Sequence, residues 1–96
     1  MLRITLDENP EAMILKLEGR LTGPWVAELD HLWEKAATVR ANRKILLDLR
    51  ATTFADADGI RALRSIYEQT RADFLTDTPW TKYLAEEIQS TDKGQN

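Results

Sequence analysis

Apolar and polar residues alternate along the first part of the chain in two short runs. The runs 2–6 and 13–17 each place an apolar residue at every second position. This period puts successive side chains on opposite faces of a strand, and it is typical of strands with one buried face. The segment 7–11 between the runs is rich in turn-forming residues. The pattern therefore predicts two strands that pair as a hairpin.

Three later segments carry apolar residues at the spacing of an amphipathic helix. The first begins near 22–24, where a proline suits the first helical turn. The second begins near Ile60, directly after Gly59, and the third begins with residues 77–79. The apolar stripes of these predicted helices consist of Trp25, Leu29, Leu32 and Ala36; Ile60, Leu63, Ile66 and Tyr67; and Trp80, Tyr83, Leu84 and Ile88.

Two apolar segments lack helical spacing and complete the predicted sheet. The continuous run 45–47 suits a central strand with both faces covered, and residues 74–75 suit a short last strand. The predicted order is β-β-α-β-α-β-α, an α/β fold with a mixed four-stranded sheet and helices packed on it. Residues 1–89 are expected to form a single domain, and residues 90–96 a flexible tail.

Composition limits the classes of function. The chain has 96 residues, 16 acidic against 13 basic residues, and a formal net charge of -3. This balance argues against binding to nucleic acid or to an anionic membrane. The chain has no cysteine, which excludes disulfides, thiol nucleophiles and zinc-thiolate sites. No cofactor is expected, and the absence of a signal peptide or a long apolar segment predicts a cytoplasmic protein.

Several residues that could take part in catalysis or binding have simpler structural interpretations. His31 is the single histidine, and its predicted helical neighbours belong to a solvated face. The three tryptophans are expected to pack in the core or an interface, because each lies on or beside an apolar stripe. The arginines on the second predicted helix form a charged stripe that is either a solvated face or part of a protein contact: Arg61, Arg64 and Arg71.

Three carboxylates suggest the main alternative to a binding domain. Asp48, Asp56 and Asp58 follow one another around the end of the central strand, and carboxylate oxygens are the ligands that Mg²⁺ prefers. Asp48 also ends a strand in a way that resembles the phosphoacceptor strand of receiver domains. That family needs an acidic pair after its first strand and a lysine after its last, and this chain has neither in the required place. A metal-dependent phosphoacceptor built on these carboxylates remains the alternative.

The element order and the segment 47–59 together resemble the STAS-domain family, the fold of anti-sigma factor antagonists. Family members carry a strand like Leu-Asp-Leu, a short Thr/Ser-containing loop with a buried apolar residue, and then Asp-Ser-Ser-Gly at a helix start. The corresponding residues here are 47–49, 52–54 and 56–59, and residues 17–21 resemble the family strand that leads to the first helix. The resemblance covers residues 2–89.

The resemblance also implies a site that this chain has altered. In phospho-regulated members, the serine before the glycine accepts a phosphate, and this chain has Asp58 at that position, after Ala57. Asp58 would either imitate the phosphorylated state permanently or serve as the N-cap of the helix, and we favour the N-cap. Thr52 and Thr53 are expected to bond to nearby backbone rather than to accept phosphate.

The resemblance and the lack of a catalytic constellation predict a non-enzymatic, regulatory protein-interaction domain without a bound metal. Its partner would be an anti-sigma factor or another regulator. The predicted contact surface comprises Thr52, Thr53, Asp56, Ala57, Asp58, Gly59, Arg61 and Arg64. Self-association through the edge strand 2–6 is an open alternative, because uncovered strand edges pair readily.

Overall fold

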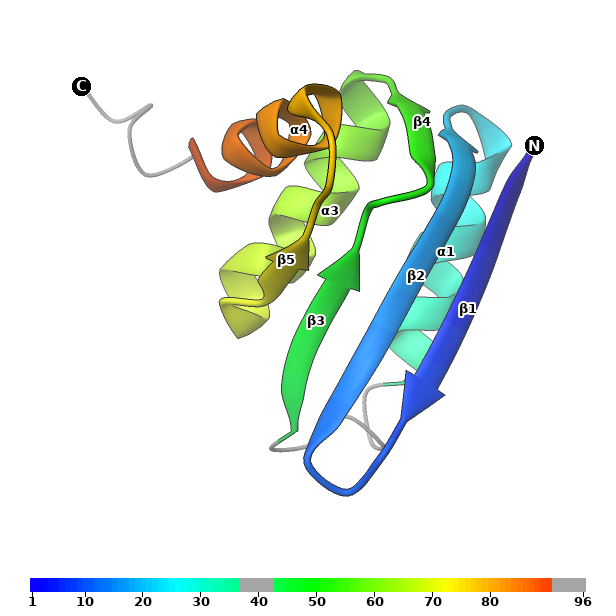
Figure 1. Cartoon of the computed structure of the whole chain (residues 1–96). Helices are drawn as coiled ribbons and strands as arrows, with labels where there is room; N and C mark the ends of the chain where they lie inside the picture. The colour runs from blue at the N-terminus through cyan, green and yellow to red at the C-terminus, as the bar shows by residue number, and fades with distance from the viewer. Residues whose placement is uncertain (37–42, 91–96) are drawn as a thin grey trace.

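The protein forms one mixed sheet with helices packed against it. The structure, a computed structural model, describes residues 1–36 and 43–90. Figure 1 shows α1 and α3 behind the sheet, with α4 against α3 beyond the end of β5. The elements are, in chain order, β1 (Leu2–Glu8), β2 (Ala12–Leu21), α1 (Pro24–Lys35), β3 (Lys44–Asp48), β4 (Thr52–Ala55), α3 (Ala57–Thr70), β5 (Asp73–Leu75) and α4 (Pro79–Gln89).

The long strand β2 organises the sheet. β1 pairs with it in antiparallel register, from Leu2 opposite Gly19 to Glu8 opposite Met13, which confirms the predicted hairpin. On its other side β2 pairs in parallel first with β3 and then with β4, and β5 pairs in parallel with β3. The register shifts between Gly19 and Arg20, and Gly19 has φ +108°, a conformation that favours glycine.

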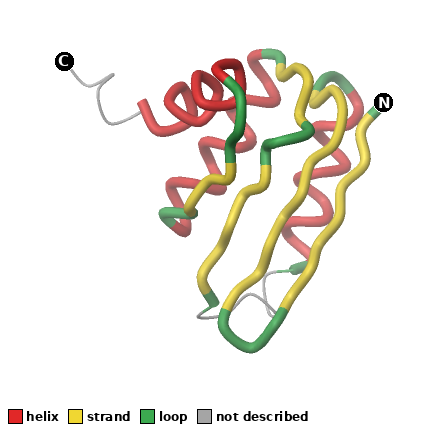
Figure 2. Tube along the Cα trace, viewed as in Figure 1, coloured by secondary structure: helices red, strands yellow, loops and turns green. Residues whose placement is uncertain are grey.

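The predicted α/β class with a mixed sheet is confirmed, but the sheet has five strands rather than four. The additional strand is β4, which the sequence analysis assigned to a loop. Figure 2 shows a short loop between β3 and β4, both of which lie along β2. In β4 the two end residues, Thr52 and Ala55, are buried and the two middle ones are exposed. This strand therefore has no two-residue period to reveal it.

The core lies between the sheet and the helices. Alternate residues of β2, namely Met13, Leu15 and Leu17, are buried, as the period predicted. Trp33 is buried and the other two tryptophans pack partly against the core, as expected, whereas Tyr83 of the third predicted stripe is 53% exposed.

The final helix begins as predicted, with Thr78 as N-cap. The predicted tail is described only at residue 90, because 91–96 lie outside the described residues.

Candidate functional site

The segment that resembles the STAS motif runs from the end of β3 through β4 into α3. β4 ends at Ala55, and the backbone N–H of Asp56 donates to the carbonyl of Leu21 at the end of β2. Gly59, in the first turn of α3, is buried against the same residue. A Cβ at this glycine would lie 2.5 Å from the Leu21 carbonyl oxygen. The start of α3 therefore packs on β2 at a distance that only glycine permits.

Asp56, not Asp58, is the N-cap of α3. Its Oδ1 accepts a hydrogen bond from the N–H of Gly59 at 2.8 Å, and its Oδ2 accepts one from the N–H of Gly23 at 3.4 Å. The predicted N-cap role of Asp58 is thus wrong by two residues, and the helix begins at Ala57 instead of near Ile60. The cause is local, because Asp56 has the extended backbone that an N-cap needs and Asp58 already lies in the first helical turn.

Asp58 projects from the first turn of α3 into solvent. Its side chain is 70% exposed and its Oδ1 lies 3.6 Å from Nε of Arg61, whose side chain is 62% exposed. An ion pair this exposed contributes little to stability. The negative charge is nevertheless favourably placed, since the N-terminus of a helix carries a partial positive charge. Asp58 is therefore accessible to a binding partner, as is its neighbour Ala57.

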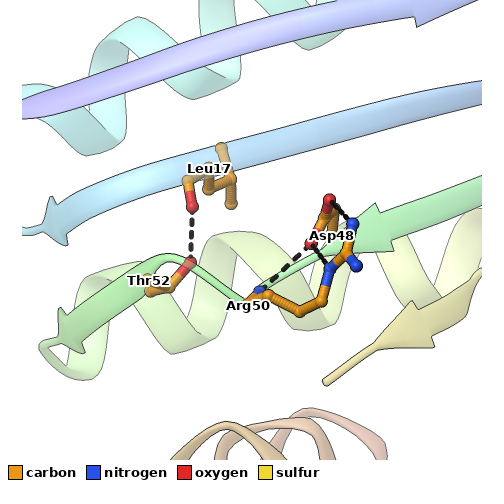
Figure 3. Close-up of polar contacts among 4 residues, drawn as sticks. All are labelled: Leu17, Asp48, Arg50 and Thr52. Carbon is orange, nitrogen blue, oxygen red and sulfur yellow. Dashed lines mark hydrogen bonds and ion pairs between the residues drawn. The ribbon is translucent and has the colours of Figure 1, made fainter. Parts of the chain in front are cut away.

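Thr52 is buried beneath the motif and does not form part of its exposed surface. It is 2% exposed, and its hydroxyl donates to the carbonyl of Leu17 on β2 at 2.8 Å (Figure 3). Its own carbonyl accepts a hydrogen bond from Nε1 of Trp80 at 3.0 Å, which ties β4 to α4. The predicted partner-contact role of this residue does not fit its burial. Its hydroxyl does bond to a backbone carbonyl, but to one on another strand rather than to the nearby backbone that was expected. Thr53 is exposed.

Asp48 at the end of β3 is also structural. Its carboxylate is 4% exposed and accepts two hydrogen bonds from the guanidinium of Arg50, at 3.0 and 2.9 Å (Figure 3). A third hydrogen bond comes from the backbone N–H of Arg50. The side-chain hydrogen bonds from Arg50 lower the pKa of Asp48 below its usual value, although burial acts in the opposite direction. This carboxylate is thus fully engaged within the protein.

The carboxylates of the alternative hypothesis do not form a common site. Within residues 1–36 and 43–90, no group of three or more histidine, cysteine, aspartate or glutamate side chains is placed to hold a metal ion. Asp48 is paired with Arg50, Asp56 caps α3, and Asp58 lies beside Arg61. This geometry gives the metal-dependent phosphoacceptor no support.

Arg64 differs from Arg61 although both lie on the predicted basic stripe. It is half-buried, and its guanidinium donates to the backbone carbonyl of Glu87 near the end of α4 at 2.8 Å. Its Nε is buried and has no hydrogen-bond partner among the described residues. A cation that bonds to the last carbonyls of a helix stabilises that helix end. Arg64 therefore joins α3 to α4. Its predicted place on the exposed contact surface does not fit its partial burial and this internal hydrogen bond.

One exposed aromatic residue was not included in the predicted surface. The resemblance implied that Phe54 is the buried apolar residue of the loop, but it is 40% exposed and Ala55 is buried beside it. The guanidinium of Arg20 lies over its ring, 4.8 Å from the centroid. We use the term β4–α3 surface for the exposed residues of this region: Arg20, Thr53, Phe54, Ala57, Asp58 and Arg61.

Comparison with known proteins identifies the family of this chain. The family model of the STAS domain matches residues 3–74. The chain belongs to the STAS-domain family. The matched region includes β4, the N-cap Asp56 and the buried Gly59. A search of curated proteins gave no significant match.

Two solved structures share the STAS fold of this chain. One is an anti-sigma factor antagonist from Mycobacterium paratuberculosis, with 18% identity and a TM-score of 0.65 over 98% of this chain and 82% of that one. The other is a protein from Shewanella loihica with a SpoIIAA-like fold, with 11% identity and a TM-score of 0.60 over 93% of this chain and 77% of that one. No helix in the described part of this STAS chain is both long and apolar enough to span a membrane.

Proposed function

We propose that this STAS domain is a non-catalytic regulatory module that binds a protein partner through the β4–α3 surface. The proposal rests on two kinds of residue within the motif, those that hold the backbone in place and those that are exposed. Asp56 and Gly59 fix the start of α3, while Phe54, Asp58 and Arg61 project outward from the segment that they fix. A rigid scaffold that presents exposed aromatic and charged side chains is suited to protein recognition.

The surface chemistry narrows the kind of partner. Phe54 under the guanidinium of Arg20 supplies apolar area next to a cation, and Asp58 and Arg61 supply opposite charges on the adjoining turn of helix. Aromatic residues and arginine are the types that most often anchor protein interfaces. The structural likeness to an anti-sigma factor antagonist makes an anti-sigma factor, or another regulator of that kind, the first partner to test.

We further propose that Asp58 occupies the acceptor position of the family switch and makes its charge permanent. A phosphoserine would bring about −1.5 to −2 charges and three acceptor oxygens to this helix start. The carboxylate of Asp58 brings one charge and two oxygens, and its side chain, which is 70% exposed, is accessible to a partner. On this proposal the binding state of the domain does not depend on phosphorylation of residue 58.

Affinity capture from native cytosol tests the interaction. The immobilised wild type is compared with the double variant Phe54→Ser, Arg61→Glu, and captured proteins are identified by mass spectrometry. We expect the variant to lose at least about 90% of the captured partner, since truncating one or two interface anchors typically costs 2 kcal/mol or more. Lys35→Glu, a charge reversal at an exposed position of α1, is the matched control and should capture normally. Equal capture by wild type and the double variant would reject the β4–α3 surface.

Phosphorylation is tested separately with Asp58→Ser. After incubation with cytosolic extract and ATP, the native protein should show no phosphate at residue 58, and the variant should acquire it. The acceptor would be accessible, because the aspartate it replaces is exposed. Phosphate on Thr53 of the native protein would contradict the permanent-charge proposal, whereas buried Thr52 should stay unmodified.

A further inference from the structure

The longest free edge of the sheet belongs to β1. This strand pairs with β2 on one side, and no other described strand pairs with its opposite side. It runs in unbroken register over seven residues, with no bulge and no proline. Figure 1 shows its outer side facing away from the rest of the molecule. Proteins usually protect such edges with bulges, prolines or short strands, because an unprotected edge pairs with another chain.

The ladder between β1 and β2 determines which backbone groups remain free. At its two ends, the N–H of Arg20 donates to Met1 and the N–H of Asn9 donates to Ala12. In an antiparallel pair, residues that bond to the neighbouring strand alternate with residues that face away from it. With the observed register, the odd-numbered residues of β1 bond to β2. The N–H and C=O groups that face the free edge are therefore those of Leu2, Ile4, Leu6 and Glu8.

The sequence of β1 is complementary to itself in the antiparallel direction. A two-fold axis at Thr5 places Arg3 opposite Asp7 of a second copy, and Ile4 opposite Leu6. The same register places residues whose backbone groups face the free edge opposite one another, Ile4 with Leu6 and Leu2 with Glu8, so the hydrogen bonds between the two copies can form. Opposite charges, apolar pairs and paired threonines are each favourable across strands.

Other registers lack this agreement. Moving the axis to Ile4 or to Leu6 keeps the backbone pattern but places a threonine opposite Arg3 or Asp7, so the two charges no longer meet. Moving it to Arg3 or Asp7 places like charges opposite each other. The strand sequence therefore specifies a single register.

The apolar side chains of β1 also have exposed area to cover. Ile4 and Leu6 pack against the core but remain only half-buried, whereas their counterparts on β2, Leu17 and Leu15, are fully buried. The opposite edge of the sheet, formed by β5, offers fewer residues for strand pairing. There β5 has only three residues, and a groove of about 320 Å³ with charged lining separates it from α4.

We propose that two copies of this chain pair through β1, in antiparallel register about Thr5, to form one continuous sheet. The interface is isologous and closes on itself, so it produces a dimer and not a fibre. β2 lies between β1 and β4, so the dimer leaves both β4–α3 surfaces uncovered. The inference stands independently of the proposed function, because it uses a different surface.

Sedimentation equilibrium of the full chain, from micromolar to millimolar concentration, tests the proposal. We expect a reversible monomer–dimer equilibrium. Asp7→Arg places an arginine opposite Arg3 of the second copy and should weaken dimerisation at least about tenfold, since it replaces two attractive cross-strand pairs with repulsive ones. The double variant Arg3→Asp, Asp7→Arg restores opposite charges and should restore the dimer. Urea unfolding of each variant, followed at low concentration, confirms that the monomer is folded.

Amide hydrogen exchange gives a second test that requires no mutation. The amides of Ile4 and Leu6 should gain protection as the protein concentration rises, whereas those of Arg3 and Thr5, which bond to β2, should be protected at every concentration. A chain that stays monomeric throughout the range would overturn the proposal. A dimer that Asp7→Arg does not weaken, or that the folded double variant does not restore, would also overturn it.

Discussion

Two aspartates at the start of α3, only two residues apart, have opposite roles. Asp56 accepts hydrogen bonds from Gly59 and Gly23 and so holds α3 and the turn before α1 together. Asp58 makes one exposed contact, with Arg61. The difference shows that a single motif combines residues that fix the backbone with residues that the fixed backbone presents. Changes to the first kind should affect stability, and changes to the second kind should affect binding.

The largest stability effect is expected at Gly59. In Gly59→Ala, the new Cβ would lie 2.5 Å from the carbonyl oxygen of Leu21, so α3 must move away from β2. We expect a loss of about 3 kcal/mol in the free energy of unfolding, the upper range for overpacking. Ala57→Ser, at an exposed position two residues earlier, is the control and should change stability by less than ~0.5 kcal/mol. Urea denaturation measures both.

Arg50 provides the next largest effect. Arg50→Met leaves the buried carboxylate of Asp48 without its guanidinium partner, and we expect a loss of about 2 kcal/mol at neutral pH, allowing for the half-exposed arginine. The matched change Arg61→Met, in an exposed pair, should cost less than ~0.5 kcal/mol. An equal loss in the two variants would contradict the distinction between scaffold and surface.

The effect of Arg50 should also depend on pH. Folding lowers the pKa of Asp48 below 3.8, so the stabilisation from its ionised form is complete above that value. It is lost as pH falls through the lower pKa of the folded state. The stability difference between wild type and Arg50→Met should therefore be constant above about pH 5 and shrink below pH 4. Denaturant unfolding between pH 2.5 and 7 measures it, and a constant difference throughout would contradict the assignment.

The smallest stability effects compare the two aspartates directly. Asp56→Ala removes the N-cap of α3 and should cost about 1 kcal/mol, the typical value for an N-cap. Asp58→Ala removes one exposed charge near the helix N-terminus and should cost only a few tenths of a kcal/mol. Equal stability losses in thermal unfolding, or a larger loss for Asp58→Ala, would contradict the roles assigned to the two aspartates.

The sequence predicted the fold well wherever a regular period exposed the buried face. The β1–β2 hairpin and the amphipathic stripes follow from such periods, whereas the central strand was predicted from its continuous apolar run. β4 was missed because only its two end residues are buried, and a four-residue strand of this kind has no period. It forms because β2 extends beyond β3 and offers β4 a second segment to pair with.

The site was harder to predict, because the roles of its residues depend on distant contacts. Thr52 is buried because its hydroxyl reaches Leu17 on β2, 35 residues earlier in the chain. Arg64 is engaged because α4 ends beside it. Neither contact leaves a mark in the local sequence. Asp58 and Arg61 were predicted to be accessible and are exposed, because their surroundings are solvent and their own helix, although the predicted N-cap role of Asp58 was wrong.

Photo-crosslinking at two matched alanines tests whether a partner binds at the β4–α3 surface. Ala57 lies at the start of α3 within the β4–α3 surface, and Ala27 lies on α1; both are exposed. A photo-reactive amino acid is placed at one or the other position, and the domain is irradiated in native cytosol. We expect a discrete crosslinked protein from position 57 and none from position 27. A crosslink from position 27 alone, or the same product from both positions, would contradict it.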